Sequence, residues 1–398
     1  MDVMIMGWFG HLNAGDDAIL YAETKILKEI LGEELSKIKI LSFGKVLPPL
    51  DNGINAFFVH FKPPGGIRDF LKEAKTSDIF ILGGGGFLFE LVGARIPKNL
   101  LYYALPTIIS KKIGMPTLGY GLEVGRPRTN LGKLLLKMTL RNMDLTVVRD
   151  GRSFDVARTV GGDKLSERIR KTVDITFSQA DVFSRMPKDQ NFDLRDYLVL
   201  VPTSPKLSIS RGAKLTDKEG NEITRKIALM LKTFLERVDL NVAIIPFQCG
   251  VVDPSDRNTA LQIKRELRRE LPLDVLRRIE VKVYDSMDFR HKISAILEST
   301  ITVGMRLHSL IFATFGGIPM LGMDYSSESK VKVFMEELGI PSKFFDLRIA
   351  SPKEMAETLM NILDNHKDVS NQIKRRYLHF KQVSQQNSEL LKDFLSDL

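Results

Sequence analysis

The sequence is poor in the residues that hold small or metal-dependent folds together. Cys249 is the only cysteine among 398 residues, which excludes an intrachain disulfide and fits a reducing compartment. No catalytic triad around Cys249 suggests a nucleophile, so we interpret it as a small buried apolar residue. The six histidines are scattered, with no two at the spacing of metal ligands, so we predict no metal site.

Long apolar runs are also lacking. The longest, NLLYYALPTIIS at 99–110, is shorter than the roughly 20 residues that a membrane-spanning helix needs. The first residues, MDVMIMGWFG, have an acidic second position and no basic region before the apolar ones, so they predict a strand and not a signal peptide. We therefore expect a cytoplasmic protein.

Acidic residues are the minority charge. Lys and Arg total 58 against 49 Asp and Glu, a net charge of +9, which favours an anionic partner such as nucleic acid, a membrane surface or an acidic small substrate. The basic clusters at 264–270 and 373–377 are mixed with acids or lie on predicted helices, so we interpret them as solvated helix faces. No DNA-binding or RNA-binding signature is present, and we expect no nucleic acid partner. The charge does permit peripheral contact with the inner face of an anionic membrane.

The remaining composition is that of a soluble globular protein, with 43% hydrophobic and 27% charged residues. At roughly 100–200 residues per domain, the length predicts two domains. Short apolar strands alternate with helical patterns along the chain, which is typical of parallel sheets covered by helices on both faces. We therefore predict an α/β protein of two doubly wound, Rossmann-like domains that face each other across a cleft.

The domain boundaries follow from a break in this alternation. The polar stretch 184–196 contains a proline and has no clear period, so we interpret it as a linker. We assign 1–185 to an N-terminal Rossmann-like domain and 197–365 to a C-terminal one. Residues 366–398 are predicted to form a C-terminal helix, with packing back onto the N-terminal domain as one hypothesis. In open parallel sheets ligands bind beyond the carboxyl ends of the strands, so functional motifs should directly follow strands.

The first such motif is GWFGHLNAGDDAIL at 7–20, a glycine-containing loop that leads into a helix. Its spacing is not that of a dinucleotide-binding fingerprint. Asp16 and Asp17 would repel a phosphate, and together with the Asn13 amide beside Gly15 they suit sugar hydroxyls better. The alternative is structural: Asp16 or Asp17 is the N-cap of the helix, a role worth about 1 kcal/mol.

The second motif is DIFILGGGGFLFE at 78–90, in which four glycines, including Gly84 and Gly85, follow a buried strand. Such a run can present several backbone N–H groups to a ligand oxygen. The alternative is a bend that allows tight packing between helix and strand. Arg149 ends a later strand and is placed to reach the same edge, unless it pairs with the neighbouring Asp150.

The third motif is TVGMRLHSLIFATFGG at 302–317. Apolar positions at 307, 310, 311 and 314 predict a helix with one buried face, which places Arg306 at its first residues and His308 in its first turn. A cation there costs roughly 0.3–1 kcal/mol by repulsion from the helix dipole. A bound phosphate or carboxylate, held by the free N–H groups and the guanidinium, would offset that cost. A surface arginine beside a solvated histidine is the alternative.

Two neighbouring residues extend this hypothesis. A free helix N-terminus disfavours a charged imidazole, whereas a bound dianion favours it, so ligand binding would prepare His308 as a general acid. Lys330 falls at the start of the next predicted helix. We interpret it as a second anion contact, with a solvated lysine as the alternative.

Together, five stretches resemble the polysaccharide pyruvyl transferase family, and the resemblance spans nearly the whole chain. The last stretch is the most specific, because Gly304, Arg306, Leu307, His308 and Ser309 match the family's G-x-R-L-H-S core. The five stretches are GWFGHLNAGDDAIL, DIFILGGGGFLFE, GYGLEVGRP at 119–127, LTVVRDGRS at 145–153 and VGMRLHSLIFATFGGIPMLGMDYSSESKV at 303–331.

The resemblance implies a fold similar to that of the two-domain GT-B glycosyltransferases. It also implies a reaction in which phosphoenolpyruvate gives its pyruvyl group to a sugar of a cell-surface polysaccharide or its precursor, forming a cyclic ketal and releasing phosphate. Phosphoenolpyruvate is then a co-substrate, and no cofactor is expected. Arg306 and Lys330 would bind the donor's anions, Lys330 at a slightly longer spacing from Tyr325 than the family's, and His308 would protonate the methylene carbon.

The same resemblance assigns the other residues to two sides of the site. On the donor side, backbone N–H groups near Leu307 and His308 would help to hold the anions, with Gly304 and Ser309 beside them. The residues expected to line the acceptor side, where Asp16 is a candidate base, are Asn13, Gly15, Asp16, Gly84 and Gly85.

The sequence leaves two other functions open. A GT-B glycosyltransferase with a nucleotide-sugar donor is the main alternative, and a non-catalytic carbohydrate-binding protein is the second. The sequence leaves open whether the acceptor is lipid-linked or soluble, which sugar it is, and the oligomeric state.

Overall fold

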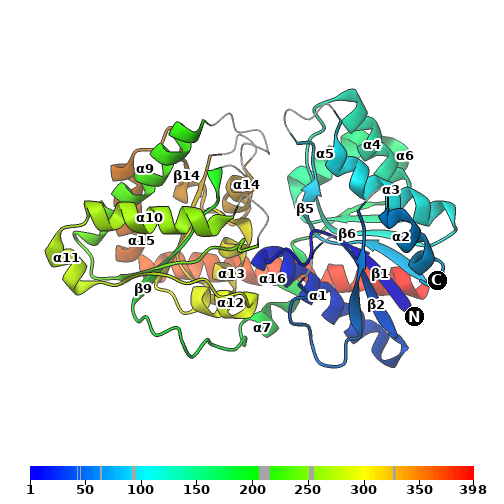
Figure 1. Ribbon diagram of the computed structural model, residues 1–398, viewed down its shortest axis with the longest axis horizontal. Helices are drawn as coiled ribbons and strands as arrows, with labels where there is room; N and C mark the ends of the chain where they lie inside the picture. The colour runs from blue at the N-terminus through cyan, green and yellow to red at the C-terminus, as the bar shows by residue number, and fades with distance from the viewer. Residues whose placement is uncertain are drawn as a thin grey trace. The chain divides into compact units, whose positions relative to one another are not determined.

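The computed structural model describes residues 1–42, 44, 46–62, 65–91, 96–205, 216–250, 255–325 and 329–398. The chain divides into two compact units. The first unit comprises Met1–His11, Asp16–Gln179 and Phe380–Leu398, and the second comprises Leu12–Gly15 and Ala180–His379. Each unit contains its own β-sheet with helices around it (Figure 1).

The first unit is built on an eight-stranded sheet whose described strand pairs are all parallel. The strand order is β3-β2-β1-β4-β6-β7-β8, with β5 paired to β6. The strands are β1 (Asp2–Met6), β2 (Lys37–Ser42), β3 (Ala56–His60), β4 (Ile79–Leu82), β5 (Gly85–Leu88), β6 (Thr117–Val124), β7 (Leu145–Val148) and β8 (Ile169–Lys171).

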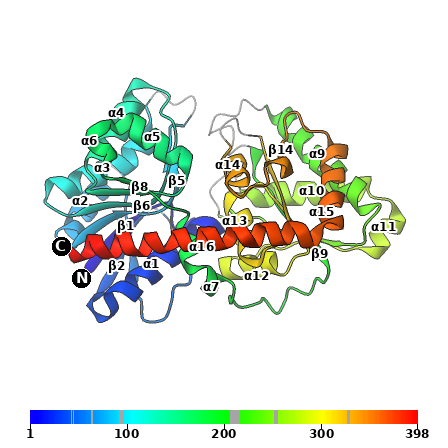
Figure 2. The same ribbon diagram turned by 180° about the vertical axis from the view of Figure 1, so that it is seen from behind.

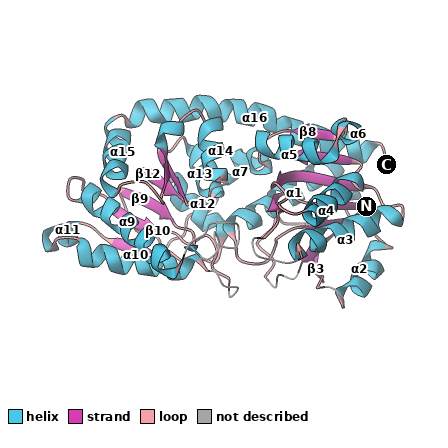
Figure 3. Ribbon diagram, turned by 90° about the horizontal axis from the view of Figure 1, so that it is seen from above, coloured by secondary structure: helices cyan, strands magenta, loops and turns pink. Residues whose placement is uncertain are grey.

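Helices lie on both faces of this sheet, as the secondary-structure colours of Figure 3 show. They are α1 (Ala14–Leu31), η1 (Gly32–Glu34), α2 (Gly66–Ala74), α3 (Lys98–Lys112), α4 (Asn130–Arg141), α5 (Gly151–Gly161), α6 (Asp163–Ser166) and η2 (Ile175–Gln179). Strand β4 is buried along its whole length, and so is β1 after its first residue. The apolar strands therefore have a covered sheet on both sides, as the alternation predicted.

The second unit has a six-stranded parallel sheet in the order β11-β10-β9-β12-β13-β14. The strands are β9 (Tyr197–Val201), β10 (Asn241–Ile244), β11 (Val281–Val283), β12 (Ile301–Gly304), β13 (Met320–Asp324) and β14 (Phe344–Asp346). The helices are α7 (Ala180–Phe183), α9 (Asp217–Leu235), α10 (Asp256–Glu270), α11 (Leu273–Arg278), α12 (Phe289–Leu297), α13 (Leu307–Gly316), α14 (Lys330–Glu337), η3 (Pro341–Lys343), α15 (Pro352–Asp364) and the first part of α16 (His366–Ser396).

This strand order creates a switch point. The chain runs outward from β9 through β10 to β11, and then returns to the other side of β9 with β12. The connections that follow β9 and β12 therefore leave the sheet in opposite directions. A crevice for ligands is expected at the carboxyl ends of these two strands.

The 31-residue helix α16 contributes to both units, because the division falls between His379 and Phe380 (Figure 2). Its last part is tied into the first unit by hydrogen bonds. The hydroxyl of Tyr120 donates to the carbonyl of Asn387 at 2.9 Å, and the Asn387 amide donates to the carbonyl of Val173 at 3.2 Å. No helix within the described ranges is both long enough and apolar enough to cross a membrane.

Sequence patterns missed several short elements. Strand β5 begins inside the glycine run, where the composition predicts a loop, because glycine has little intrinsic strand preference. Strand β8 has only three residues, Ile169–Lys171, which is too short to show a clear alternation. The four-residue helices α6 and α7 and the six-residue α11 are too short to show a hydrophobic period.

Candidate functional site

The carboxyl ends of β9 and β12 bring the third sequence motif to the switch point of the second unit. Strand β12 ends at Gly304, and α13 begins at Leu307 with Arg306 as its N-cap, in an extended conformation at φ −106° and ψ 128°. Arg306 was predicted among the first residues of the helix and is instead the N-cap directly before them, whereas His308 lies in the first turn as predicted. The helix ends at Gly316, and its C-cap, Gly317, has a left-handed φ of 63° that favours glycine.

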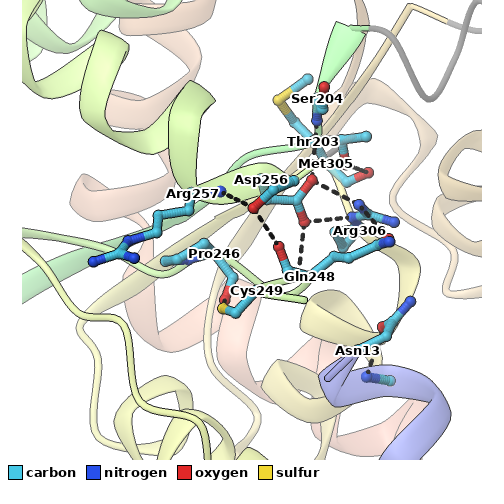
Figure 4. A network of polar contacts seen from close by, with 12 residues as sticks. Asn13, Thr203, Ser204, Pro246, Gln248, Cys249, Asp256, Arg257, Met305 and Arg306 are labelled. Atoms are coloured by element: carbon cyan, nitrogen blue, oxygen red, sulfur yellow. Dashed lines mark hydrogen bonds and ion pairs between the residues drawn. The ribbon is translucent and has the colours of Figure 1, made fainter. Parts of the chain in front are cut away.

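Arg306 has a partner that the sequence did not reveal. Its Nε lies 3.0 Å from Oδ2 of Asp256, and its Nη2 lies 2.6 Å from Oδ1 (Figure 4). This two-bond contact is the strongest geometry for a guanidinium and a carboxylate. The Asp256 side chain is completely buried, and the Arg306 side chain is 11% exposed. The positive charge at the helix N-terminus is therefore balanced by a carboxylate of the protein itself.

The Asp256 carboxylate is held from all sides. Besides the guanidinium it accepts the backbone N–H groups of Ser204 and Gln248, each at 3.0 Å. Ser204 follows β9 and Gln248 follows β10, so the carboxylate connects three strand ends. Asp256 lies in the first turn of α10, where the helix dipole favours a negative charge.

Asp256 could have been suspected from one local signal only. A serine followed by an aspartate before the apolar period of 256–270 is a typical helix start, and Ser255 is indeed the N-cap, accepting the N–H of Arg257 at 3.2 Å. That signal predicts a capping role. It does not predict an ion pair with a residue 50 positions later in the chain.

The imidazole of His308 lies against the first sequence motif. A Cβ atom built on Gly15 would come 2.2 Å from Nδ1 of His308, so a side chain at this position would displace the ring. Asn13 forms an isolated antiparallel bridge with Gln248, and Ala14 donates its N–H to the carbonyl of Phe247 at 3.0 Å. Residues predicted for the acceptor and for the donor are thus brought together within the second unit (Figure 4).

The helix start at this motif differs from the structural alternative. Helix α1 begins at Ala14, so Asp16 and Asp17 lie in its first turn and neither is the N-cap. Asn13 immediately precedes the helix, and its Oδ1 accepts the N–H of Gly15 at 3.2 Å. The interpretation of Asp16 or Asp17 as the N-cap was therefore wrong, because the side-chain amide of Asn13 accepts the hydrogen bond at the start of the helix.

Two of the predicted donor residues shape the turn between β12 and α13. The hydroxyl of Ser309 is buried and donates to the carbonyl of Arg306 at 2.6 Å, which fixes the first turn of the helix. A Cβ atom on Gly304 would come 2.5 Å from that hydroxyl oxygen and 2.5 Å from Cδ2 of Leu310. Glycine at 304 therefore permits close packing of the helix on the strand. Direct contact of Gly304 and Ser309 with a donor stays a prediction.

Lys330 is the first residue of α14, as predicted, and it is half-buried. The helix follows β13, the strand next to β12 in the sheet. Lys330 and Arg306 thus follow neighbouring parallel strands. Residues 326–328, between Tyr325 and this helix in the sequence, lie outside the described residues.

In the first unit, the glycine run surrounds a buried carboxyl group that the sequence analysis overlooked. Glu23 of α1 is 1% exposed, and its Oε1 accepts the N–H of Gly84 at 2.5 Å. Burial raises the pKa of Glu23 to about 8, an effect that the Gly84 N–H opposes and the negative charge of Asp174 reinforces. Glu23 therefore holds a proton at neutral pH. The sequence signal that could have revealed this group is a glutamate on the apolar side of a predicted helix.

The other two residues predicted for the acceptor side, Asp16 and Gly85, lie close to each other. A Cβ atom on Gly85 would be 3.4 Å from Oδ1 of Asp16, and the φ of Gly85 is +128°, which non-glycine residues rarely adopt. Asp16, Gly84 and Gly85 are thus neighbours at the carboxyl end of β4. Any side chain at position 85 would therefore be strained, and its Cβ would lie 3.3 Å from the ring of Phe87.

Arg149 is committed to an ion-pair network in the first unit. Its Nη1 lies 2.9 Å from Oδ2 of Asp174, and Nη2 contacts Glu123. Asp150 is more distant, at 3.9 Å, and accepts the N–H of Ser153 at 2.7 Å as the N-cap of α5. Burial opposes the charge of Arg149, but the surrounding carboxylates raise its pKa above the ordinary value. Pairing with Asp150 alone is therefore too simple an interpretation.

Comparison with known proteins places this geometry in a family. Residues 13–327 match the family model of the polysaccharide pyruvyl transferases. The chain belongs to the polysaccharide pyruvyl transferase family. The matched span includes both Asn13 and the Arg306–Ser309 turn, and it ends just before Lys330.

This pyruvyl transferase family member is also similar to the amylovoran biosynthesis protein AmsJ of Erwinia amylovora. The two are 21% identical over 368 residues, which cover 89% of this chain and 81% of AmsJ. Both findings connect the chain to polysaccharide biosynthesis, and they confirm the resemblance seen in the sequence motifs.

Solved structures confirm the predicted fold class. The UDP-GlcNAc 2-epimerase of Neisseria meningitidis, bound to UDP-GlcNAc, matches with a TM-score of 0.59 at 10% identity over 100% of both chains. The UDP-GlcNAc 2-epimerase of Methanocaldococcus jannaschii matches with 0.54 at 11% identity over 91% of this chain and 92% of its own. The α,α-trehalose 6-phosphate synthase of Burkholderia multivorans gives 0.55 at 10% identity over 99% and 98%. The chain therefore has a GT-B-like fold of two parallel-sheet α/β domains.

Proposed function

We propose that this protein transfers the pyruvyl group of phosphoenolpyruvate to a sugar of a cell-surface polysaccharide or its precursor, forming a ketal and releasing phosphate. The family membership supports a transferase of polysaccharide biosynthesis. The observation that carries the donor assignment is the turn after β12, where a fixed guanidinium and an imidazole flank the N-terminus of α13. Phosphoenolpyruvate offers a phosphate and a carboxylate, the two groups that such a turn binds best.

The roles follow from the chemistry of the donor. Arg306 and the N–H groups at Leu307 and His308 bind one anionic group, and Lys330 binds the other. His308, protonated in the donor complex, gives its proton to the methylene carbon, and C2 becomes oxocarbenium-like. One sugar hydroxyl attacks C2 and loses its proton to a base, for which Asp16 is our candidate. The C2–O bond to phosphate breaks, and a neighbouring hydroxyl closes the ketal with loss of a second proton.

The acceptor assignments are part of the same proposal. Asn13 and Gly15 lie beside the donor turn in the second unit, and Asp16, Gly84 and Gly85 are neighbours in the first. Amide, carboxylate and backbone N–H groups are suited to sugar hydroxyls. The sugar itself, and whether it is lipid-linked, would be identified by assay.

Phosphate release tests the reaction directly. Purified protein is incubated with phosphoenolpyruvate and candidate saccharides, and released phosphate is measured together with the mass of the ketal product. His308→Gln should abolish turnover but leave donor binding within a few-fold, because the ring acts mainly in the proton transfer. The control is His60→Gln, which changes an exposed histidine at the end of β3. Normal turnover by the His308 variant would remove the imidazole from the mechanism.

Calorimetry with phosphoenolpyruvate alone tests the donor site without knowledge of the acceptor. Arg306→Ala should weaken binding by roughly 10-fold or more, the effect of losing a charge-assisted hydrogen bond worth about 1.5–3 kcal/mol. Unchanged affinity would refute the anion-site assignment. Thermal stabilisation by UDP-sugars or GDP-sugars, with none by phosphoenolpyruvate, would favour a nucleotide-sugar glycosyltransferase.

A further inference from the structure

Helices α3 and α4 pack against each other in the first unit and share an unusual surface. Leu131, Leu134 and Met138 of α4 are 43%, 53% and 37% exposed, and Leu101 of α3 is 43% exposed. Leu131, Leu134 and Met138 are three and then four residues apart, so they form one stripe along the helix. A stripe of large apolar side chains in water is typical of an interaction surface.

A row of cations runs beside this stripe. Lys133, Lys137 and Arg141 are four residues apart on α4, and all are exposed. Neither the α3 nor the α4 sequence contains an acidic residue. By contrast, the basic helix α10 carries its own acids, and Arg269 there pairs with Glu266 at 3.1 Å. We define the α3–α4 face as the exposed apolar residues of these two helices together with the row of cations on α4: Leu101, Leu131, Lys133, Leu134, Lys137, Met138 and Arg141.

We propose that the α3–α4 face docks the protein on the surface of an anionic lipid bilayer. The lysines and the arginine would meet the negatively charged headgroups, while the leucines and the methionine enter the boundary between headgroups and acyl chains. Long basic side chains can keep their charges among the headgroups while their stems lie along apolar surface. Figure 2 shows α3 and α4 on the outside of the first sheet, away from the C-terminal part of α16.

The charge pattern favours this occupant over a second copy of the chain. A symmetric dimer through the α3–α4 face would place the row of cations of one copy near that of the other, with no acid on either helix to relieve the repulsion. An anionic membrane has no such conflict. Lys111 at the end of α3 has an acidic partner, Asp144, but Lys111 is not part of the face.

The α3–α4 face lies near the sheet edge that we assign to the acceptor. Helix α3 follows β5, and α4 follows β6, so both helices start at the carboxyl edge of the first sheet. Gly84 and Gly85 lie at the same edge, at the end of β4. A glycan attached to a membrane lipid would therefore be presented at the edge that we assign to the acceptor. This last step rests on the proposed function, whereas the membrane docking itself does not.

Vesicle flotation tests the docking without any enzymatic readout. The full-length protein is floated with vesicles of phosphatidylcholine alone or of an equimolar mixture with phosphatidylglycerol. We expect binding to the mixed vesicles that weakens as salt is raised, and little binding to the neutral ones. Lys133→Glu with Lys137→Glu should weaken binding roughly 25-fold or more, at about fivefold for each lost basic residue. Leu131→Ser with Leu134→Ser should weaken binding while the remaining binding stays salt-dependent.

Matched control variants distinguish an effect of the α3–α4 face from a general effect of charge or of exposed apolar side chains. Arg265→Glu with Arg268→Glu changes two exposed cations on α10 by the same total charge. Leu273→Ser with Met287→Ser removes two apolar side chains that are 74% and 55% exposed in the second unit. Both control variants should bind the mixed vesicles like the wild type. Circular dichroism establishes that all four variants are folded.

Three results would overturn the proposal. One is that the wild type does not float with anionic vesicles at low salt. Another is that the control variants lose as much binding as the α4 variants. The third is a concentration-dependent dimer, seen by light scattering, that the Leu131/Leu134 variant abolishes, because the face would then be an interface between copies. A protein that floats but releases no phosphate would refute only the proposed function.

Discussion

Replacing Asp256 by asparagine is the sharpest test of how the candidate site is held together. Oδ1 accepts Ser204 N–H and Arg306 Nη2, and Oδ2 accepts Gln248 N–H and Arg306 Nε. Each oxygen thus faces two donors. Whichever way the new amide is oriented, its NH₂ group would face two N–H donors. The variant therefore loses two hydrogen bonds as well as the negative charge.

The cost of this change can be bounded from the burial. Removing one partner of a buried ion pair typically costs about 3–5 kcal/mol, because the remaining charge is left uncompensated. The Asp256 side chain is completely buried and the Arg306 side chain is 11% exposed, so water can solvate the remaining charge only weakly. We expect Asp256→Asn to lower the free energy of unfolding by about 3–5 kcal/mol. Urea unfolding followed by far-ultraviolet circular dichroism measures the change. The control is Asp274→Asn, at a carboxylate that is 78% exposed and 3.9 Å from Arg278, where at most about 0.5 kcal/mol should be lost.

A double-mutant cycle shows whether the carboxylate serves the arginine in particular. Arg306→Met alone leaves Asp256 buried without its cation, and the double variant removes both charges. The double variant should lose less stability than the sum of the single losses, with a coupling energy of about 1–3 kcal/mol. Additive losses, or a loss below about 1 kcal/mol for Asp256→Asn, would refute the ion pair as the element that fixes Arg306. In that case the guanidinium would have to be positioned by other contacts.

Three further predictions concern single side chains. The pKa of Glu23 is raised from 4.5 to about 8, so between these pH values the folded state keeps a proton that the unfolded state loses. The free energy of unfolding should therefore fall as the pH rises from 4.5 to 8. Urea unfolding at a series of pH values measures this dependence, and Glu23→Gln should flatten it. Burial lowers the pKa of His11 from 6.5 to about 4, and its ring stacks on Trp8 with centroids 4.2 Å apart, so stability should fall as pH drops from 6.5 toward 4. Since Trp8 is the only tryptophan, its fluorescence should titrate near pH 4 in the wild type and not in His11→Phe, and a midpoint near 6.5 would contradict the buried stack. Gly15→Ala should displace the His308 ring and lower turnover by about 10-fold or more with little change in circular dichroism, whereas full turnover would show that the ring position is not critical.

Sequence patterns predicted the layers of the fold because a strand that is buried on both faces is apolar at consecutive positions. Strands such as β4, with four consecutive buried residues, are apolar throughout, and the helices between them carry one apolar face. The position of Arg306 was predictable for the same reason, since the apolar period of α13 fixes where that helix starts. Strand β5 was not predictable, because its pairing with β6 is a tertiary contact and its first residues are glycines.

The candidate site was predicted only as far as single motifs reach. Sequence reasoning placed Gly15 with the acceptor and His308 with the donor, and gave no reason to expect that the two touch. It also missed Asp256, which joins Arg306 from a different helix, because the pairing depends on how β9, β10 and β12 are ordered in the sheet. Contacts between residues far apart in sequence have no local period, so only the assembled sheet reveals them.

The Asp256–Arg306 ion pair changes the electrostatic interpretation of the proposed donor turn. An isolated arginine at a helix N-terminus would attract any anion by its charge, but here that charge is matched by a buried carboxylate. In the proposed function, selectivity for a donor would then come from directed hydrogen bonds to the guanidinium edge and to backbone N–H groups at the start of α13. A site of this kind discriminates by geometry more than by net charge. Inorganic phosphate and sulfate should therefore compete weakly with a donor that carries two anionic groups at a fixed separation.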